Sequence, residues 1–521
     1  MSRTLSIGLL DRTPGWDILL EWTGAPWRVV HNVSELSVER FALIITNRHL
    51  WKEEIEAVEA FVSSGGAVLD IGRFLPHMMP NAIERRWFTS VLSGASDAFS
   101  TGIPILDLHG RGVGPRQRDL LNGLLGFFPM GRGVVATLGI DPGLMMYDYR
   151  ARAKRFPGLD GKHPAERVAR LTKGEIGLLL RRIVVHLFHE QRLPFVRKRS
   201  FPADASNVFC FRVDSDYGSR EQIDALYDVA RSTSMPMTWF IHTEGHSGWL
   251  DRFVRFEGQE SAFHCSRHKT FPEKERNLAN MQEGCRALKD AGLEVSGYAA
   301  PNGIWHHGIA QAIEEQDFLY SSEFGLAYDA LPFNPILPMN RRVNNDFYRA
   351  LQIPVHPISV GNLARVGISD ERMIDYYKNV IAWKEYSQEP LIFYHHPTHE
   401  RWGVVEQIIE AAHNPNVLLL RFGEYAEWWS KRTVSQFEVA LDDGNLNLYS
   451  YNRDSSVFLD LFFDDGTVGI VKDDGMISLA DIPKMYPSNP PESREKHSHL
   501  RKFSFTVARR ALRDSLIRMG R

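Results

Sequence analysis

The chain has 521 residues, of which 43% are apolar and 24% are charged, and its formal net charge is −3. This length predicts two or three domains, and the charge gives no reason to expect a nucleic-acid partner. Three cysteines exclude a disulfide framework. The chain start has no signal-peptide pattern, and no apolar run is long enough to cross a bilayer, so we expect a cytoplasmic protein.

Residues 1–195 predict a parallel α/β domain of the Rossmann or flavodoxin-like type. Buried strands are expected at 41–47, 67–72 and 131–141, with an amphipathic helix at 51–62. The segment is similar to class-I glutamine-amidotransferase-like domains, which use a cysteine nucleophile. Because no cysteine precedes Cys210, we expect a non-catalytic scaffold, assembly surface or ligand-sensing module.

The basic, proline-containing stretch 192–206 marks a domain boundary, and a new alternation begins at residue 207. This alternation predicts an α/β barrel over 205–432, in which catalytic residues lie at the C-terminal ends of the strands. The expected strands are 207–213, 236–241, 294–299, 350–356 and 390–396, and the expected helices are 219–233, 273–291, 371–386 and 402–412.

Short alternating runs over 433–490, separated by Asp-Gly and Asn turns, predict a small antiparallel β module. The remaining segment, 491–521, ends in a stretch (501–521) with seven Lys/Arg and one Asp, which predicts a basic amphipathic helix. Two interpretations stay open: peripheral contact with anionic lipid at the inner membrane face, and an ordinary docking helix.

The run FRVDSDYG (211–218) brings Asp214 and Asp216 to the end of a predicted strand. Two positions apart on a strand, both carboxylates point to one face, so one can bind a metal while the other works as a base. The alternative is turn capping, because Asp, Ser and Gly favour turns.

The run FHCSRHKTF (263–271) places His264 and His268 at i, i+4 spacing. Neutral imidazoles at this spacing can share one divalent metal, and two histidines with one aspartate leave positions open for water and substrate. His242 and His246 have the same spacing and form a rival pair.

Residues 207–432 resemble the polysaccharide-deacetylase (NodB-homology, carbohydrate esterase) family, which implies a distorted (β/α) barrel. FRVDSDYG looks like the first family motif, with Asp214 as base and Asp216 as metal ligand. FHCSRHKTF sits where the second motif is expected, so His264 and His268 would complete the metal site.

The third family motif, Arg-x-Pro-x-Gly, reads AAPNG here, with Ala299 where the family has arginine. That arginine is thought to hold the base aspartate in place. Arg212 lies two positions before Asp214 and faces the same side of the strand, so its guanidinium would supply the missing charge and keep Asp214 ionised. The alternative is that Arg212 pairs elsewhere.

The last family motif, a strand ending in histidine, matches LIFYHHPTHE (391–400). His396, which precedes Pro397, fits the His-Pro form better than His395 and would protonate the departing amine. Asp329 is a weak candidate for the residue that orients this histidine.

The resemblance implies one divalent metal, with zinc favoured and cobalt or manganese as alternatives. The ion lowers the pKa of a bound water, and Asp214 takes its proton. A backbone N–H near Tyr217 would stabilise the oxyanion. Substrate contacts are expected at Tyr217, at Pro301 of the third motif and at Trp305, whereas the other aromatic residues are expected to be mostly core.

The function expected from these residues is N-deacetylation of an N-acetylated sugar, in surface polysaccharide or its precursor. Two alternatives stay open. The first is another amide hydrolase on the same barrel, such as one that opens cyclic amides. The second is a catalytically silent carbohydrate-binding scaffold, which the absence of arginine at Ala299 favours. The sequence predicts no particular oligomeric state.

Overall fold

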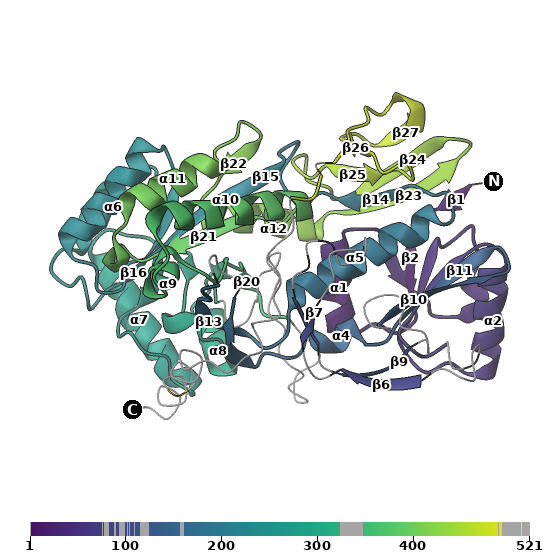
Figure 1. Cartoon of the computed structure of the whole chain (residues 1–521), viewed down its shortest axis with the longest axis horizontal. Coiled ribbons are helices and arrows are strands. Elements are labelled where there is room, and N and C mark those ends of the chain that lie inside the picture. Colours follow the sequence, from purple (N-terminus) through teal and green to yellow (C-terminus); the bar gives the residue numbers. More distant parts are fainter. Residues whose placement is uncertain are drawn as a thin grey trace. The chain divides into compact units, whose positions relative to one another are not determined.

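The computed structural model describes residues 2–74, 124–156, 161–323 and 347–487, with short pieces at 77, 83–87, 90–92, 99, 101, 103, 105–108, 110–114, 489–491 and 512. The chain forms two compact units that alternate along the sequence (Figure 1). One unit consists of Met1–Met146, Glu175–Asp204 and Ser430–Pro490, and the other includes Tyr147–Gly174 and Ala205–Trp429. The units therefore differ from the consecutive blocks 1–195, 205–432 and 433–490 that the sequence predicts.

The first unit holds a six-stranded sheet in the order β10-β11-β5-β4-β2-β3, parallel except for the β10–β11 pair. Strands and a helix occur at the predicted positions 41–47, 51–62, 67–72 and 131–141. The elements are β2 (Ile7–Leu9), α1 (Pro14–Thr23), β3 (Trp27–Val29), β4 (Leu43–Thr46), α2 (Lys52–Ser63), β5 (Ala67–Asp70), β10 (Leu125–Met130), β11 (Gly133–Leu138), α4 (Pro142–Met145) and most of α5 (Lys173–His189).

One hydrophobic core cluster of this unit lies between the sheet and α2. Val58 and Phe61 of the helix belong to one buried cluster with Ile44 of β4 and Val68 of β5, each 3% exposed or less. Burial of each such side chain stabilises the fold by roughly 1.5–3 kcal/mol. The apolar face of α2 therefore holds the helix against the sheet. The N-terminal part of this unit also contains two antiparallel two-stranded sheets. One pairs β6 (Ile83–Trp87) with β9 (Gly110–Gly114), and the other pairs β7 (Ser90–Leu92) with β8 (Ile105–Asp107).

The antiparallel strands expected over 433–490 are present, but they belong to two sheets rather than one separate module. Each sheet includes a strand from the N-terminal half of the chain: the orders are β1-β23-β24-β27 and β14-β25-β26. Local patterns cannot show such long-range pairing. The strands are β1 (Arg3–Thr4), β14 (Phe195–Lys198), β23 (Gln436–Asp442), β24 (Asn445–Tyr451), β25 (Leu459–Phe462), β26 (Val468–Val471) and β27 (Gly475–Ser478).

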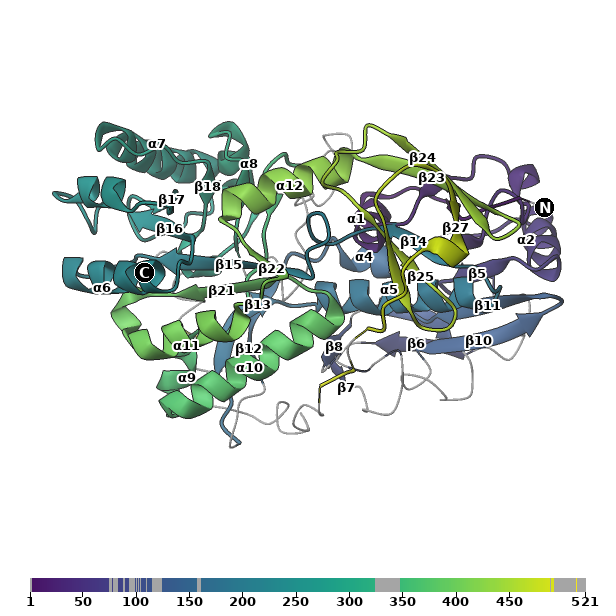
Figure 2. The same cartoon turned by 90° about the horizontal axis from the view of Figure 1, so that it is seen from above.

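The second unit is built on a curled parallel sheet in the order β20-β19-β18-β17-β16-β15-β21, with β22 paired to the start of β15. Figure 2 shows α7 on one side of the strands and α10 and α11 on the other. The strands are β15 (Asn207–Asp214), β16 (Met237–His242), β17 (Glu260–Cys265), β18 (Gly297–Tyr298), β19 (Tyr320–Ser321), β20 (Leu351–Gln352), β21 (Leu391–His395) and β22 (Val417–Leu419).

The helices between these strands are α6 (Arg220–Ser232), α7 (Lys274–Asp290), α8 (His307–Glu315), α9 (Val360–Arg365), α10 (Asp370–Ser387) and α11 (Trp402–Ala412). Helix α12 (Phe422–Val434) follows the last strand and continues into the first unit at Ser430. The strand–helix alternation predicted over 205–432 is thus confirmed. Among the described residues, the two edge strands of this sheet, β20 and β21, do not pair with each other. A hydrogen bond from His356 N to Ile392 O (2.8 Å) joins the segment after β20 to β21.

A hairpin from earlier in the chain belongs to this unit. It consists of β12 (Ala151–Arg155) and β13 (Ala165–Ala169), which pair antiparallel. Within the described residues, no helix is long and apolar enough to span a membrane. The basic segment 501–521, apart from Leu512, and the candidate Asp329 lie outside the described residues.

Candidate metal centre and active site

Strand β15 delivers the two candidate carboxylates. All eight residues of this strand are buried between parallel neighbours β16 and β21, because its apolar side chains face packed layers on both sides. Asp214 is its last residue, and Asp216 lies in the turn that follows. The backbone of Asp216 has φ +39°, in the left-handed region that non-glycine residues rarely adopt.

His242 and His246, the alternative histidine pair, contact the residues of this turn. His242 Nδ1 lies 2.8 Å from the carbonyl oxygen of Asp216, and His246 Nε2 lies 2.9 Å from Ser215 Oγ. Burial lowers the pKa of both histidines, to about 4 for His246, so both rings are neutral near pH 7. A neutral His242 donates from Nδ1 to the carbonyl. The pair therefore holds the strained turn and does not join the candidate metal ligands.

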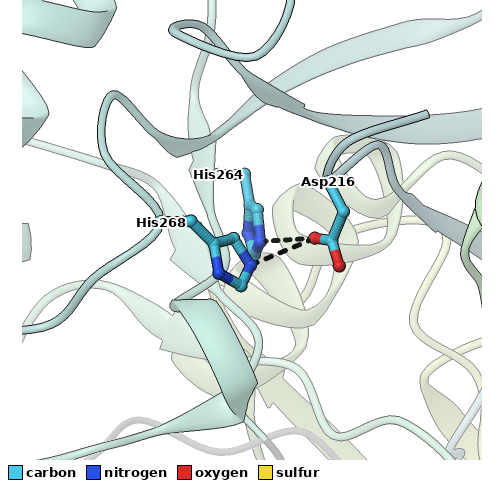
Figure 3. Close-up of side chains that lie close together, drawn as sticks. All are labelled: Asp216, His264 and His268. Atoms are coloured by element: carbon cyan, nitrogen blue, oxygen red, sulfur yellow. Dashed lines mark ion pairs between the residues drawn. The ribbon is translucent and has the colours of Figure 1, made fainter. Parts of the chain in front are cut away.

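Asp216, His264 and His268 converge on one point. Nε2 of His264 and Nε2 of His268 lie 3.1 and 3.2 Å from the same oxygen, Oδ1 of Asp216. Figure 3 shows both rings turned toward it. The candidate ligand atoms of the three residues all lie within 4.8 Å of one another.

The geometry of these three residues fits a divalent metal. Zinc binds histidine nitrogen and carboxylate oxygen at about 2.0–2.2 Å, so tetrahedral ligands lie roughly 3.3 Å apart. Asp216 Oδ1 and His264 Nε2 are buried, and in the described part of the chain neither makes a hydrogen bond of good geometry. Buried polar atoms of this kind require a partner, and a cation at this point would supply one.

A backbone oxygen orients His264. His264 Nδ1 donates to the carbonyl oxygen of Ala299 at 2.6 Å, which leaves Nε2 as the free ligand atom. This contact uses the main chain, so it does not depend on the side chain at position 299.

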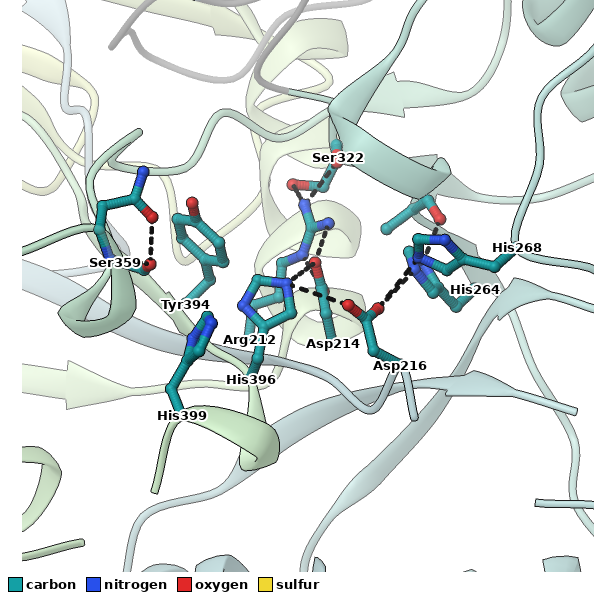
Figure 4. Close-up of polar contacts among 12 residues, drawn as sticks. Arg212, Asp214, Asp216, His264, His268, Ser322, Ser359, Tyr394, His396 and His399 are labelled. Atoms are coloured by element: carbon teal, nitrogen blue, oxygen red, sulfur yellow. Dashed lines mark hydrogen bonds and ion pairs between the residues drawn. The ribbon is translucent and has the colours of Figure 1, made fainter. Parts of the chain in front are cut away.

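Arg212 contacts Asp214 through two parallel hydrogen bonds. Nε donates to Oδ1 at 2.5 Å and Nη2 donates to Oδ2 at 2.7 Å, and the two side chains are 0% and 5% exposed. Nη1 of Arg212 donates to the carbonyl oxygen of Ser322 at 2.5 Å (Figure 4). Bidentate pairing of this kind fixes a carboxylate in orientation as well as in charge. The guanidinium thus occupies the place next to Asp214 that the sequence analysis proposes for it.

The charge state of Asp214 results from two opposing effects. Burial raises its pKa, but Arg212, with smaller contributions from His264 and His396, more than offsets this, so the pKa lies below the ordinary value. Asp214 is therefore ionised near neutral pH and can accept a proton.

Strand register separates His396 from His395. In the β15–β21 pair, Arg212 lies opposite Tyr394 and Val213 opposite His395. Since side chains alternate along a strand, His396 shares the face of Arg212. His396 Nε2 lies 3.8 Å from Asp214 Oδ2 and 3.5 Å from Asp216 Oδ2.

His395 faces the other side of the sheet. It is fully buried, and its Nε2 bonds the carbonyl oxygen of Glu400 at 2.9 Å. Burial, with the neighbouring His399 and His396, lowers the pKa of His395 to about 3. The Nδ1 atom of His396 is buried without a hydrogen-bond partner among the described residues. The residue that the family resemblance predicts to orient His396 is therefore not found among the described residues.

One cavity joins these groups. It encloses about 170 Å³, on the order of ten water-sized volumes, which is enough for a small organic group and not only for a water. Asp214, Asp216, His264, His268 and His396 line it. Its other polar walls come from Glu166, Arg167, Asn302, Asn362, Arg365 and His399.

The predicted substrate contacts lie elsewhere or at the margin. Trp305 is 4% exposed, packs on Tyr149 with ring centroids 4.5 Å apart, and is not among the residues that line the cavity. Pro301 is buried and does not line it either. Tyr217 is 66% exposed and its ring stands 5.6 Å from that of His268, beside the metal centre.

Several residues of this site are not predicted from the sequence. Glu166 and Arg167 lie far from the barrel segment in sequence, and no local signal assigns them to it. His399 has a signal, since it follows His396 by three residues, and Gly361 leaves room for it: a Cβ there would lie 2.2 Å from His399 Nδ1.

Glu323 was also missed. It is fully buried and accepts hydrogen bonds from Ala300 N (3.1 Å) and Ser321 Oγ (2.6 Å). It thereby supports the loop whose carbonyl orients His264. Burial raises the pKa of Glu323 to about 7.

No protein-family model matches this chain, and no curated protein matches it in sequence. Solved structures do match it. An assigned polysaccharide deacetylase from Mycobacterium smegmatis is 16% identical over 46% of this chain and 95% of its own, with a TM-score of 0.39.

A structure named Puue allantoinase is 17% identical over 44% of this chain and 92% of its own (TM-score 0.37). A carbohydrate-esterase family 4 pseudoenzyme from Bacillus anthracis is 10% identical over 43% of this chain and 68% of its own (TM-score 0.31). At these identities and TM-scores, the likeness assigns neither a family nor a function to this chain.

Proposed function

We propose that this protein is a metal-dependent amide hydrolase of the polysaccharide-deacetylase type that removes the acetyl group from an N-acetylated sugar. The observation that carries the proposal is the convergence of Asp216, His264 and His268 beside a second, ionised carboxylate, Asp214. A structural ion pair needs no second carboxylate, whereas a hydrolytic site needs both metal ligands and a base.

Asp216, His264 and His268 would hold one divalent metal, and two nitrogens with one oxygen suit zinc, with cobalt or manganese as alternatives. When bound, the ion supplies Lewis-acid polarisation of the amide carbonyl and lowers the pKa of the attacking water. The amidotransferase-like character of residues 1–195 is not part of this proposal and stays a prediction.

Asp214 would take the proton of the attacking water. It lines the cavity, is ionised, and is held in one orientation by Arg212. A base that cannot rotate presents its free lone pairs to one position, which favours proton transfer from a water placed there.

His396 would donate a proton to the departing amine. It lies on the opposite side of the two carboxylates from His264 and His268 (Figure 4). An acid placed there reaches the leaving nitrogen while the base stands at the attacking water, so acid and base act on different atoms of the amide. The backbone N–H of Tyr217, next to Asp216, is the proposed donor to the oxyanion.

The test is acetate release by the purified full chain, together with its metal content by mass spectrometry. We expect about one metal per chain and acetate from N-acetylglucosamine oligomers. His264→Ala should lose both, while His413→Ala, which changes an exposed histidine of the same unit, should lose neither. Ring opening of a cyclic amide without acetate release would support the other amide hydrolase, and a metal-free protein without turnover would support the silent scaffold.

A further inference from the structure

The hairpin β12–β13 is docked on helix α9. Asn362 of α9 donates from Nδ2 to Glu166 Oε2 at 2.8 Å and to the carbonyl oxygen of Ala165 at 3.4 Å. Lys162, in the hairpin loop, donates to the carbonyl oxygen of Gly367 just beyond the helix. Since both the strand end and the loop of the hairpin are tied to this helix, the two segments form one surface.

This surface is a wall of the cavity that contains the metal centre. Glu166 and Arg167 come from β13, and Asn362 and Arg365 come from α9. The hairpin therefore adds side chains to a site whose proposed ligands and acid–base residues all come from the barrel strands or from the segments that directly follow them. We call Arg167, Asn362, Arg365 and His399 the cationic wall.

The charges on this wall are unequal. The two oxygens of the one carboxylate, Glu166, are both directed to protein donors: Oε1 accepts from Arg167 N at 2.8 Å and Oε2 accepts from Asn362. Arg167 and Arg365 thus place two guanidinium groups beside this one carboxylate on the two segments. Arg167 is only 6% exposed, and a cation buried beside a cavity gains when an anion enters.

His399 adds hydrogen-bonding capacity without charge. Arg365 Nη2 lies 3.4 Å from His399 Nε2. Burial, with the neighbouring His396 and Arg365, lowers the pKa of His399 to about 4, so the ring is neutral near pH 7. The neutral imidazole of His399 and the guanidinium groups of Arg167 and Arg365 line the same cavity, and their N–H donors match a group with several oxygen acceptors.

We propose that the cationic wall binds an anionic oxygen group of the substrate, a phosphate or a carboxylate, so that the preferred substrate is an N-acetylated sugar with a negative charge near the acetamide. This inference rests on the proposed function and adds the class of substrate to it. A sugar phosphate and a uronic acid share the chemistry that the guanidinium groups recognise, and the assay separates them.

The experiment compares acetate release from three substrates by the full metal-loaded chain: N-acetylglucosamine 1-phosphate, an N-acetylhexosaminuronic acid and a neutral N-acetylglucosamine oligomer. We expect kcat/KM for one of the two anionic substrates to exceed that for the neutral one by at least about 10-fold. Arg365→Gln should lower that value by about 10- to 100-fold, which is a larger loss than the one for the neutral substrate. Arg231→Gln, which removes an exposed arginine on α6, is the matched control.

Two results would overturn the inference: equal kcat/KM for neutral and anionic substrates, or an equal loss for both in Arg365→Gln. Arg365 is exposed, so its variant should fold, and Arg167→Gln serves as the second, buried test. If no substrate releases acetate, the proposed function fails. Calorimetry of N-acetylglucosamine 1-phosphate with Asp214→Asn then decides about the wall, since binding that Arg365→Gln abolishes supports it and absence of binding refutes it.

Discussion

Replacing Arg212 by methionine keeps most of the side-chain volume and removes both hydrogen bonds to Asp214. Because both groups are almost fully buried, loss of one partner leaves a carboxylate without compensation. Breaking a buried ion pair in this way costs about 3–5 kcal/mol. If Asp214 instead takes up a proton, the protein recovers part of this stability but loses its base.

Either outcome removes catalysis, since a protonated or misplaced Asp214 cannot accept a proton from water. General-base catalysis contributes about 10²- to 10⁴-fold, so we expect kcat to fall at least about 100-fold in Arg212→Met. The melting temperature should fall by roughly 6–20 °C if the full cost appears as lost stability. Arg212→Lys keeps the charge but not the bidentate contact, and should give an intermediate kcat.

The assay is acetate release per folded chain, with the melting temperature measured by circular dichroism and the metal content by mass spectrometry. Arg197→Met is the matched control. Arg197 is equally buried and donates twice to Asp460 (3.2 and 3.0 Å) in the other unit. It should lose stability without losing kcat. A wild-type kcat in Arg212→Met would refute the role of Arg212 in holding the base.

The remaining predictions concern the metal, the turn behind it and a buried acid. Asp214→Asn should keep its metal and lose acetate release, whereas chelation of the wild type should abolish activity until zinc is restored; activity that survives complete metal loss would contradict this. His242→Phe removes the donor to the Asp216 carbonyl and should weaken metal affinity about 10- to 100-fold in a competition titration, a result not expected if the turn holds itself. Burial raises the pKa of Glu323 from 4.5 to about 7, so the folded state loses stability as pH rises through that window and bears the full cost above it. Glu323→Gln should therefore be more stable than wild type by up to about 3 kcal/mol at pH 8 and by much less at pH 5 in urea unfolding, and an equal effect at both pH values would contradict this.

The parts of the site that follow from local sequence could be predicted. A strand period of two places Arg212 and Asp214 on one face, and the same alternation separates His396 from His395. The departure at Ala299 also pointed to Arg212 as a second source of positive charge. In the first two cases the relevant spacing lies within one strand or directly after it.

The parts that depend on distant segments could not be predicted. Nothing in the pattern of 151–169 indicates that this hairpin docks on α9, because the contact is made by single polar groups, such as Asn362 with Glu166. Trp305 was expected from the sequence to contact the substrate, but it packs on Tyr149. Burying a large aromatic side chain against another ring lowers its free energy relative to exposure to water. His242 and His246 have the spacing of metal ligands. They lie at the end of β16 and just beyond it, where they contact Asp216 O and Ser215 Oγ of the turn.

The pairing of the first strand with a late one has a consequence for how the chain folds during synthesis. Arg3 of β1 lies opposite Leu441 of β23, so about 430 residues must be made before the first strand finds its partner. At about 5–20 residues per second this delay is roughly 20–90 s. During that time the barrel segment between them can fold, while the edge of β1 that pairs with β23 still lacks its partner strand.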